Sequence, residues 1–263
     1  MKEVAGAGVH PNAVVSAKAE IAADVTIGAG TIVEADVTIG AGTRIGGCAY
    51  IANGARIGKN VRIHHGAIVG SDPQDLKYAG EKTHLYVGDN TVVREYVTLN
   101  RGTVDRGETR IGSNCLLMAY AHVAHDCIVG DNVIMANVVN LAGHVTVEDF
   151  AIIGGVVPIH QFTHVGKHTM VGGGFRVTQD IVPYALAAGW PLKITGLNTI
   201  GLRRRGFPAE VIKTLERAFK ILFYSDLNTS QAVTRIIGEI ERTPEIDELL
   251  TFIEHSTRGL VKA

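Results

Sequence analysis

The sequence predicts an all-β solenoid, a parallel β-helix of hexapeptide repeats, followed by an α-helical subdomain. Three observations support this prediction. An aliphatic residue recurs at every sixth position, a small residue often follows it, and a helical pattern replaces the repeat near residue 190. A period of six fits neither an α-helix nor a long strand. It fits short strands separated by sharp turns, stacked into a narrow prism.

The repeat starts at Val9 and continues without a break to Val69, over eleven successive positions. It resumes in the same phase at Val87 and ends at Val177. We expect these side chains to fill the prism, with glycine relieving the crowded corners. The aliphatic positions are Val9, Val15, Ile21, Ile27, Val33, Ile39, Ile45, Ile51, Ile57, Ile63, Val69, Val87, Val93, Leu99, Ile111, Leu117, Val123, Val129, Met135, Leu141, Val147, Ile153, Ile159, Val165, Val171 and Val177.

Two segments interrupt the repeat. The aliphatic position is taken by a carboxylate at Asp75, Glu81 and Asp105, so residues 71–86 and 103–110 are expected to be loops that leave the prism. Insertions in a solenoid tend to lie on its functional face.

The chain divides into a solenoid over residues 1–190 and a helical subdomain over residues 191–263. Apolar residues spaced three and four apart predict helices over 208–224, 230–242 and 244–256. Pro208 and the pair Thr243 and Pro244 are typical of helix starts.

The composition excludes several classes of protein. The net charge of −1 argues against nucleic-acid binding, and neither a secretory signal nor a membrane-spanning apolar run is present. We therefore expect a cytoplasmic protein without membrane insertion. Three cysteines without CxxC spacing suggest neither a disulfide framework nor a thiolate zinc site. Cys115 and Cys127 occupy inward positions, which favours buried structural thiols over a nucleophile.

Several short motifs go beyond a generic hexapeptide solenoid. They are Gln74-Asp75-Leu76-Lys77-Tyr78-Ala79-Gly80-Glu81, Asn100-Arg101-Gly102-Thr103, Ala121-His122-Val123-Ala124-His125-Asp126-Cys127, Leu141-Ala142-Gly143-His144, His160-Gln161-Phe162, Arg204-Arg205-Gly206-Phe207 and Ser256-Thr257-Arg258-Gly259-Leu260. In order and spacing they resemble the UDP-N-acetylglucosamine acyltransferases that open lipid A biosynthesis.

The resemblance implies a left-handed β-helix with three hexads per coil, although parallel crossovers are usually right-handed. It implies a homotrimer with active sites between subunits. It also implies transfer of a 3-hydroxyacyl chain from acyl carrier protein to the 3-position of the UDP-sugar, with no cofactor other than the donor's phosphopantetheine.

With three hexads per coil, residues 18 apart lie about 4.8 Å from one another, which places His125, Gly143 and Gln161 in one column. Acyl transfer to a hydroxyl requires a group that accepts the hydroxyl proton, and His125 suits this role of general base. Asp126 would orient its imidazole, and the N–H of Gly143 would stabilise the oxyanion. Family members carry the same roles at the matching positions.

The resemblance also assigns residues that bind substrate. Carboxylate and amide groups suit sugar hydroxyls, and an arginine fork matches a diphosphate. A lone histidine would be weak evidence, but four lie close together in the predicted site. The assigned residues are Asp75, Lys77, His122, His144, His160, Gln161, Arg204 and Arg205, with Gly173 on the acyl-chain groove and no metal ligands.

Acyl carrier protein is acidic, and residues 203–220 hold six basic residues against two acidic ones, a balance of +4 that suits such a partner. The same residues are also consistent with a solvated helix face. Trp190 and Leu192 depart from the family pattern, as does Ile200, where glutamate is common. The acyl chain length and the acceptor group, a 3-hydroxyl or a 3-amino analogue, therefore stay open.

Three other functions remain as alternatives. The first is an acetyl-CoA-dependent O-acetyltransferase on the same solenoid, which the long loop after Ser71 argues against. The second is a zinc carbonic anhydrase of hexapeptide repeats, but Cys127 occupies the position where a second histidine ligand would follow His122. The third is a non-catalytic scaffold, in which the column through His125 would be accidental.

Overall fold

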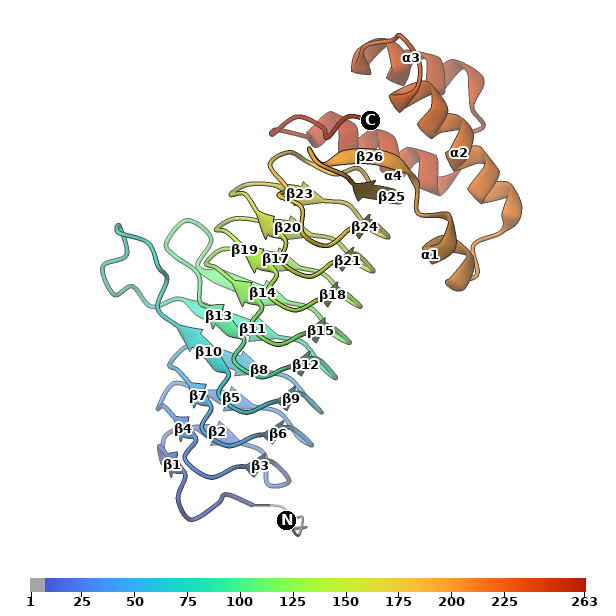
Figure 1. The fold of residues 1–263 in the computed structure, drawn as a ribbon. Coiled ribbons are helices and arrows are strands. Elements are labelled where there is room, and N and C mark those ends of the chain that lie inside the picture. Colours follow the sequence, from blue (N-terminus) through green and yellow to red (C-terminus); the bar gives the residue numbers. More distant parts are fainter. Residues whose placement is uncertain (1–7) are drawn as a thin grey trace.

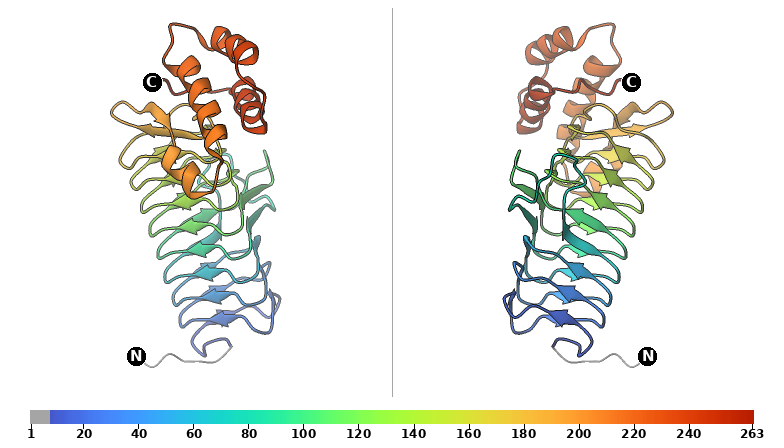
Figure 2. Two further views of the ribbon diagram at one scale, coloured as in Figure 1. Left: turned by 90° about the vertical axis from the view of Figure 1, so that its right-hand side faces the viewer. Right: turned by 90° about the vertical axis from the view of Figure 1, so that its left-hand side faces the viewer.

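The computed structural model describes residues 8–263 and shows a prism of stacked three-sided coils with helices at its C-terminal end (Figure 1). The first seven residues of the predicted solenoid lie outside this range. Figure 2 shows the coils stacked along one axis, with most of the helical part beyond the last coil and the first, orange helix beside the upper coils.

Each side of the prism is one sheet, and all strand pairs except β25 with β26 are parallel. The first sheet contains β1 (Val14–Val15), β4 (Ile32–Val33), β7 (Tyr50–Ile51), β10 (Ile68–Ser71), β13 (Thr98–Asn100), β16 (His122–Val123), β19 (Asn140–Leu141) and β22 (Pro158–Ile159). The second contains β2 (Glu20–Ile21), β5 (Thr38–Ile39), β8 (Ala55–Ile57), β11 (His84–Val87), β14 (Glu108–Ile111), β17 (Ile128–Val129), β20 (Thr146–Val147) and β23 (His164–Val165). The third contains β3 (Thr26–Ile27), β6 (Arg44–Ile45), β9 (Arg62–Ile63), β12 (Val92–Val93), β15 (Leu116–Leu117), β18 (Ile134–Met135), β21 (Ile152–Ile153), β24 (Met170–Val171), β25 (Ala185–Ala188) and β26 (Lys193–Leu197).

Three corners join the sheets. The first corner joins the first sheet to the second, the second corner joins the second sheet to the third, and the third corner leads back to the first sheet. Corner residues adopt left-handed backbone conformations, including Asp126, His144 and Phe162 at the first corner, with φ of 59°, 62° and 62°. This conformation turns the chain sharply after a strand of only two residues.

The predicted aliphatic residues from Ile27 onward form the core of the prism, whereas Val15 and Ile21 in the first coil are partly buried and Val9 is 50% exposed, because no coil covers that end within the described residues. Val123, Leu141 and Val147 are fully buried. In the regular coils the paired residues are 18 apart, as in Val123 with Leu141. The spacing rises to 30 between Val69 and Leu99 and to 24 between Leu99 and Val123. The two insertions therefore add 12 and 6 residues, and the sequence repeat keeps its phase across both.

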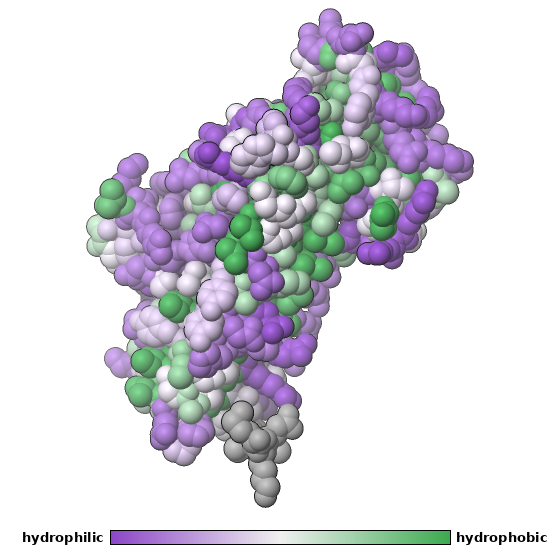
Figure 3. Space-filling view, viewed as in Figure 1, coloured by the Kyte–Doolittle hydropathy of each residue, from purple (hydrophilic) through white to green (hydrophobic). Residues whose placement is uncertain are grey.

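Both insertions leave the prism at the first corner, where β10 passes to β11 and β13 passes to β14, and they project from the same side of the solenoid (Figure 1). They are shorter than the predicted 71–86 and 103–110, because β11 begins at His84 and β14 at Glu108. These two residues pair with each other and so extend their strands beyond the hexad pattern. Figure 3 shows hydrophobic surface at the tip of the first loop, where Leu76 is fully exposed.

The C-terminal part contains α1 (Thr199–Arg204), α2 (Ala209–Phe223), α3 (Thr229–Glu239) and α4 (Pro244–His255). The last three correspond to the predicted helices, whereas α1 and the strand β26 were not predicted. β26 pairs antiparallel with β25, so the third sheet continues to Leu197, beyond the predicted boundary at residue 190. None of the helices in the described part of the chain is long and apolar enough to cross a bilayer.

Candidate active site

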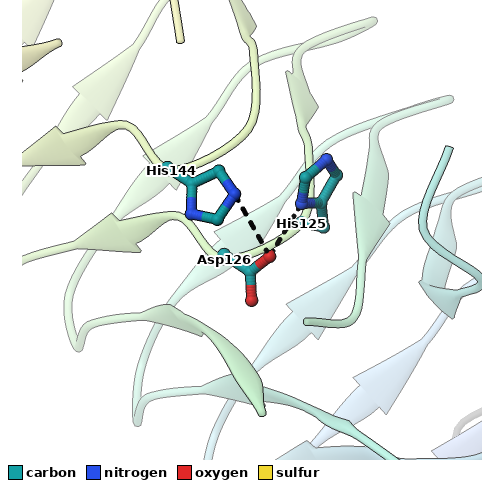
Figure 4. Close-up of side chains that lie close together, drawn as sticks. All are labelled: His125, Asp126 and His144. Carbon is teal, nitrogen blue, oxygen red and sulfur yellow. Dashed lines mark hydrogen bonds and ion pairs between the residues drawn. The ribbon is translucent and has the colours of Figure 1, made fainter. Parts of the chain in front are cut away.

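His125 and Asp126 lie side by side at the first corner, between β16 and β17, and His144 follows one coil later (Figure 4). Nδ1 of His125 lies 2.7 Å from Oδ2 of Asp126, and Nε2 of His144 lies 3.7 Å from the same oxygen. His125 is only 7% exposed, and Asp126 is fully buried. The fold thus holds a largely covered His–Asp pair.

Thr103, from the second insertion, fixes the carboxylate of Asp126. Its backbone N–H donates to Oδ1 over 2.9 Å and its hydroxyl donates to Oδ2 over 2.7 Å. Burial alone would raise the pKa of Asp126, but the hydrogen bonds from Thr103 and His125 and the nearby His144 outweigh it and lower that pKa. Asp126 therefore stays ionised although its side chain is fully buried.

The charged Asp126 selects one tautomer of His125. A carboxylate only accepts hydrogen bonds, so Nδ1 of His125 carries the hydrogen and Nε2 keeps its lone pair. The imidazole of His125 thus presents a basic nitrogen, Nε2, at the first corner.

Gly143 lies directly against the ring of His125. A Cβ atom at this position would lie 2.6 Å from Cε1 and 2.8 Å from Nε2 of His125, so only hydrogen fits. Within residues 8–263 the N–H of Gly143 makes no hydrogen bond. The predicted neighbourhood of a base and an unobstructed amide is therefore present.

Two further histidines frame the pair. His144 stacks on Phe162, with ring centroids 4.5 Å apart, and meets the ring of His125 edge-on at 5.2 Å. On β16, Nδ1 of His122 lies 2.7 Å from Oγ1 of Thr98. Burial, with a smaller contribution from the neighbouring His125, lowers the pKa of His122, so this side chain is neutral near pH 7.

The remaining predicted residues at the first corner are more exposed. Gln161 is exposed and His160 is half-buried one coil beyond His144. In the first loop, Asp75 accepts a hydrogen bond from the backbone N–H of Lys77 over 3.0 Å, and the side chain of Lys77 is exposed.

Three predicted residues lie at other places in the chain. Arg204 is exposed on α1. At the second corner, Nη2 of Arg205 donates to the carbonyl of Phe150 over 2.7 Å, and burial lowers the pKa of its guanidinium. Gly173 lies at the third corner beside Gly155. One chain alone therefore does not bring these residues to His125.

Two polar residues of the site escaped the sequence analysis. Thr103 belongs to a motif that was noticed, but its role as a donor to Asp126 depends on the loop turning back to the prism. Thr109 accepts a hydrogen bond from the backbone N–H of Asp126 over 2.8 Å and is fully buried. Buried threonines recur at this place in the hexad, as at Thr31, Thr43 and Thr91, so no sequence signal singled out Thr109.

The geometry argues against two other kinds of chemistry here. His125, Asp126 and His144 offer ligand atoms within 4.8 Å of one another, but both oxygens of Asp126 already accept hydrogen bonds. The predicted burial of Cys115 and Cys127 is confirmed, and it raises the pKa of these thiols to about 11 and about 12. Neither thiol is a nucleophile near neutral pH.

A hexapeptide solenoid with a His–Asp pair beside a free amide defines an acyltransferase of the hexapeptide-repeat class. Residues 36–71 and 108–142 match the model of the bacterial transferase hexapeptide, and residues 180–261 match the model of domain 2 of UDP-N-acetylglucosamine O-acyltransferase. The chain belongs to the UDP-N-acetylglucosamine O-acyltransferase family.

Two curated relatives match nearly the full chain. It is 50% identical to the acyl-(acyl-carrier-protein)–UDP-N-acetylglucosamine O-acyltransferase of Thiobacillus denitrificans, over 97% of this chain and all of that protein. It is 52% identical to the enzyme of the same name from Aliivibrio fischeri, over 97% of this chain and 98% of that one. The predicted family is thereby confirmed.

Solved structures of UDP-N-acetylglucosamine acyltransferases have a similar fold. The UDP-N-acetylglucosamine acyltransferase of Bacteroides fragilis superposes with a TM-score of 0.95 at 42% identity, covering 96% of this chain and 99% of that one. The Acinetobacter baumannii structure of LpxA gives a TM-score of 0.93 at 43% identity, covering 97% and 99%. The predicted left-handed parallel β-helix with a C-terminal helical region is confirmed.

Proposed function

We propose that this protein transfers a 3-hydroxyacyl chain from acyl carrier protein to the 3-hydroxyl of UDP-N-acetylglucosamine, the first step of lipid A biosynthesis. The observation that supports this mechanism is the contact between the His125 ring and Gly143, because a base and an oxyanion donor at these two residues would act on one reaction centre.

In this mechanism Nε2 of His125 removes the proton of the sugar hydroxyl as its oxygen attacks the thioester carbon. Asp126 stabilises the resulting imidazolium through Nδ1–H. The N–H of Gly143 donates to the oxyanion of the tetrahedral intermediate. The intermediate then collapses, the carbon–sulfur bond breaks, and the departing thiolate takes the proton back from His125.

The proposed base and oxyanion donor would supply a substantial part of the rate enhancement. A general base contributes about 10²- to 10⁴-fold and one oxyanion donor about 10²- to 10³-fold, together roughly 5 to 9 kcal/mol of barrier reduction. The remaining acceleration would come from holding thioester and hydroxyl in line. The substrate-binding residues would supply this, in agreement with the low exposure of His125.

We assign UDP-sugar binding to Asp75, Lys77, His122, His144, His160, Gln161, Arg204 and Arg205, and the acyl groove to Gly173. Because the arginines and Gly173 lie away from the first corner, this assignment requires a neighbouring copy of the chain. An exposed column at the third corner, Tyr96, Tyr120, Val138 and Val156, with 45% to 60% exposure, offers an apolar surface for such a homotrimer.

The proposal requires no metal and no cofactor beyond the phosphopantetheine of acyl carrier protein, and it places the protein in the cytoplasm, where that donor occurs. It is tested by incubating the protein with UDP-N-acetylglucosamine, its 3-amino analogue and a panel of acyl carrier protein thioesters, and weighing the products. We expect one 3-hydroxyacyl group on the 3-oxygen. Acylation of the amino analogue alone would overturn it, and so would transfer only from acetyl-CoA in a parallel incubation with that donor.

A further inference from the structure

The segment Ser256–Leu260, after α4, runs back along the end of the solenoid. Its anchor is Asp180, which is 1% exposed. The carboxylate of Asp180 accepts hydrogen bonds from the hydroxyl of Ser256 over 2.7 Å and from the backbone N–H of Arg258 over 3.3 Å. The backbone N–H of Asp180 donates to the carbonyl of Gly259 over 2.8 Å. The backbone of this segment is therefore fixed without help from the side chain of Arg258.

The exposed guanidinium of Arg258 instead reaches the first corner. Its Nη2 lies 3.0 Å from Nδ1 of His160. His160 follows β22, two coils beyond Ala124, which precedes His125. Two strand spacings are about 10 Å, well within the length of a sugar nucleotide or an acyl phosphopantetheine. Arg258 thus touches a side chain on the same edge of the prism as the His–Asp pair.

We infer that Arg258 is a positioning residue that fixes His160 as a neutral hydrogen-bond donor toward bound substrate. A guanidinium can only donate, so Nδ1 of His160 must accept when the two are bonded. The single hydrogen of the neutral ring then lies on Nε2. The inference rests on the proposed function, because that function makes His160 part of the substrate site.

A second contact of the same nitrogen competes with this one. Nδ1 of His160 lies 3.2 Å from the carbonyl oxygen of Gln161, and a hydrogen bond there would require the hydrogen on Nδ1. One nitrogen cannot satisfy both. The bond from Arg258 is shorter and carries a full charge, which favours it. Without Arg258, His160 would turn its hydrogen toward Gln161 and present a lone pair to the substrate.

The ligand is therefore an oxygen acceptor. Both the sugar nucleotide and the 3-hydroxyacyl group contain such oxygens, and separate KM values for the two substrates tell them apart. Losing one neutral hydrogen bond should raise the KM for the substrate concerned by about three- to tenfold, with a smaller change in kcat.

The experiment compares wild type, Arg258→Met, which removes the donors, and Arg258→Lys, which restores one. Lys262→Met is the matched control, because Lys262 lies two residues after the segment Ser256–Leu260 and its side chain bonds to Thr229. Nitrogen-15 spectra of labelled histidine, recorded well above the usual histidine pKa of about 6.5, report the tautomer of His160. The His160→Gln spectrum identifies its signals.

We expect Nε2–H in wild type and Arg258→Lys, Nδ1–H in Arg258→Met, and the KM effect only in Arg258→Met. The effect should vanish when Arg258→Met is made in His160→Gln. An unchanged tautomer in Arg258→Met, or a changed tautomer with both KM values unaltered, would refute the inference. Because the tautomer is read without turnover, an inactive wild type would instead refute the proposed function.

Discussion

Thr103 donates two hydrogen bonds to Asp126, one from its backbone and one from its hydroxyl, and so joins an insertion loop to the carboxylate behind the histidine. The loop that leaves the prism at Asn100 is thus tied back to the solenoid at its base. Because Thr103 binds the carboxylate of Asp126, the stability of the fold depends in part on whether this buried group is ionised.

Thr103→Val should lower the free energy of unfolding by about 1.5 to 3 kcal/mol at pH 7, because it removes a hydrogen bond to a charged group. Asp126 has a lowered pKa in the folded state, so its stabilisation is present above the unfolded pKa of about 3.9 and is lost as pH falls through the folded value. The difference between wild type and variant, measured by urea unfolding across pH, should therefore shrink in acid.

Thr109→Val provides the control for this pH dependence. Thr109 accepts from the backbone N–H of Asp126, which does not titrate, so its loss should cost a similar free energy at every pH. A Thr103→Val deficit that is equally independent of pH would contradict the prediction.

His125→Ala should lower kcat by about 10²- to 10⁴-fold, because it removes the proposed base. The ring is only 7% exposed, so a modest loss of stability is expected, and circular dichroism with a size measurement must show a folded protein of unchanged assembly. His255→Ala, at the exposed end of α4, is the matched control. A folded His125→Ala protein that keeps more than about one-hundredth of the wild-type rate would exclude His125 as the base.

Gly173→Met should shift the preference toward shorter acyl chains. Each buried methylene is worth about 0.8 kcal/mol, so two carbons change the ratio of kcat/KM values by roughly 15-fold. A Cβ at Gly173 would lie 3.0 Å from the carbonyl oxygen of Gly155, so the backbone must also yield slightly. Competition assays with mixed thioesters measure the shift. If the preference is unchanged, a residue other than Gly173 limits the length of the acyl chain, and exposed Trp190 becomes the next candidate.

Removal of metal ions should leave the rate unchanged. A cation in the cluster of Asp126, His125 and His144 would have to compete with the hydrogen bonds that Thr103 and His125 donate to Asp126. Activity before and after EDTA treatment checks this directly. Loss of activity that zinc restores would favour the carbonic-anhydrase alternative.

The hexad pattern was sufficient to predict stacked short strands, because the aliphatic residues from Ile27 to Val177 meet the same buried environment at intervals of six residues or a multiple of six. The pairing of His125 with Gly143 followed from a coil of three hexads, which the family resemblance supplied and the period of six did not. The tie from Thr103 could not be predicted, because it depends on how an irregular loop returns. β26 was missed because its antiparallel pairing with β25 has no counterpart in the repeat. The contact of Arg258 with His160 joins residues 98 positions apart, which no local pattern reports.

The close approach of Gly143 to the His125 ring also leaves a diagnostic signature in the sequence. Glycine is required there because the ring above it occupies the space of any Cβ, and the spacing follows from the length of one coil. A His-Asp pair followed, one full coil after the histidine, by glycine therefore distinguishes solenoids built for this chemistry from those that merely share the repeat. A larger residue at that glycine would have to move the histidine ring out of the position that it takes here.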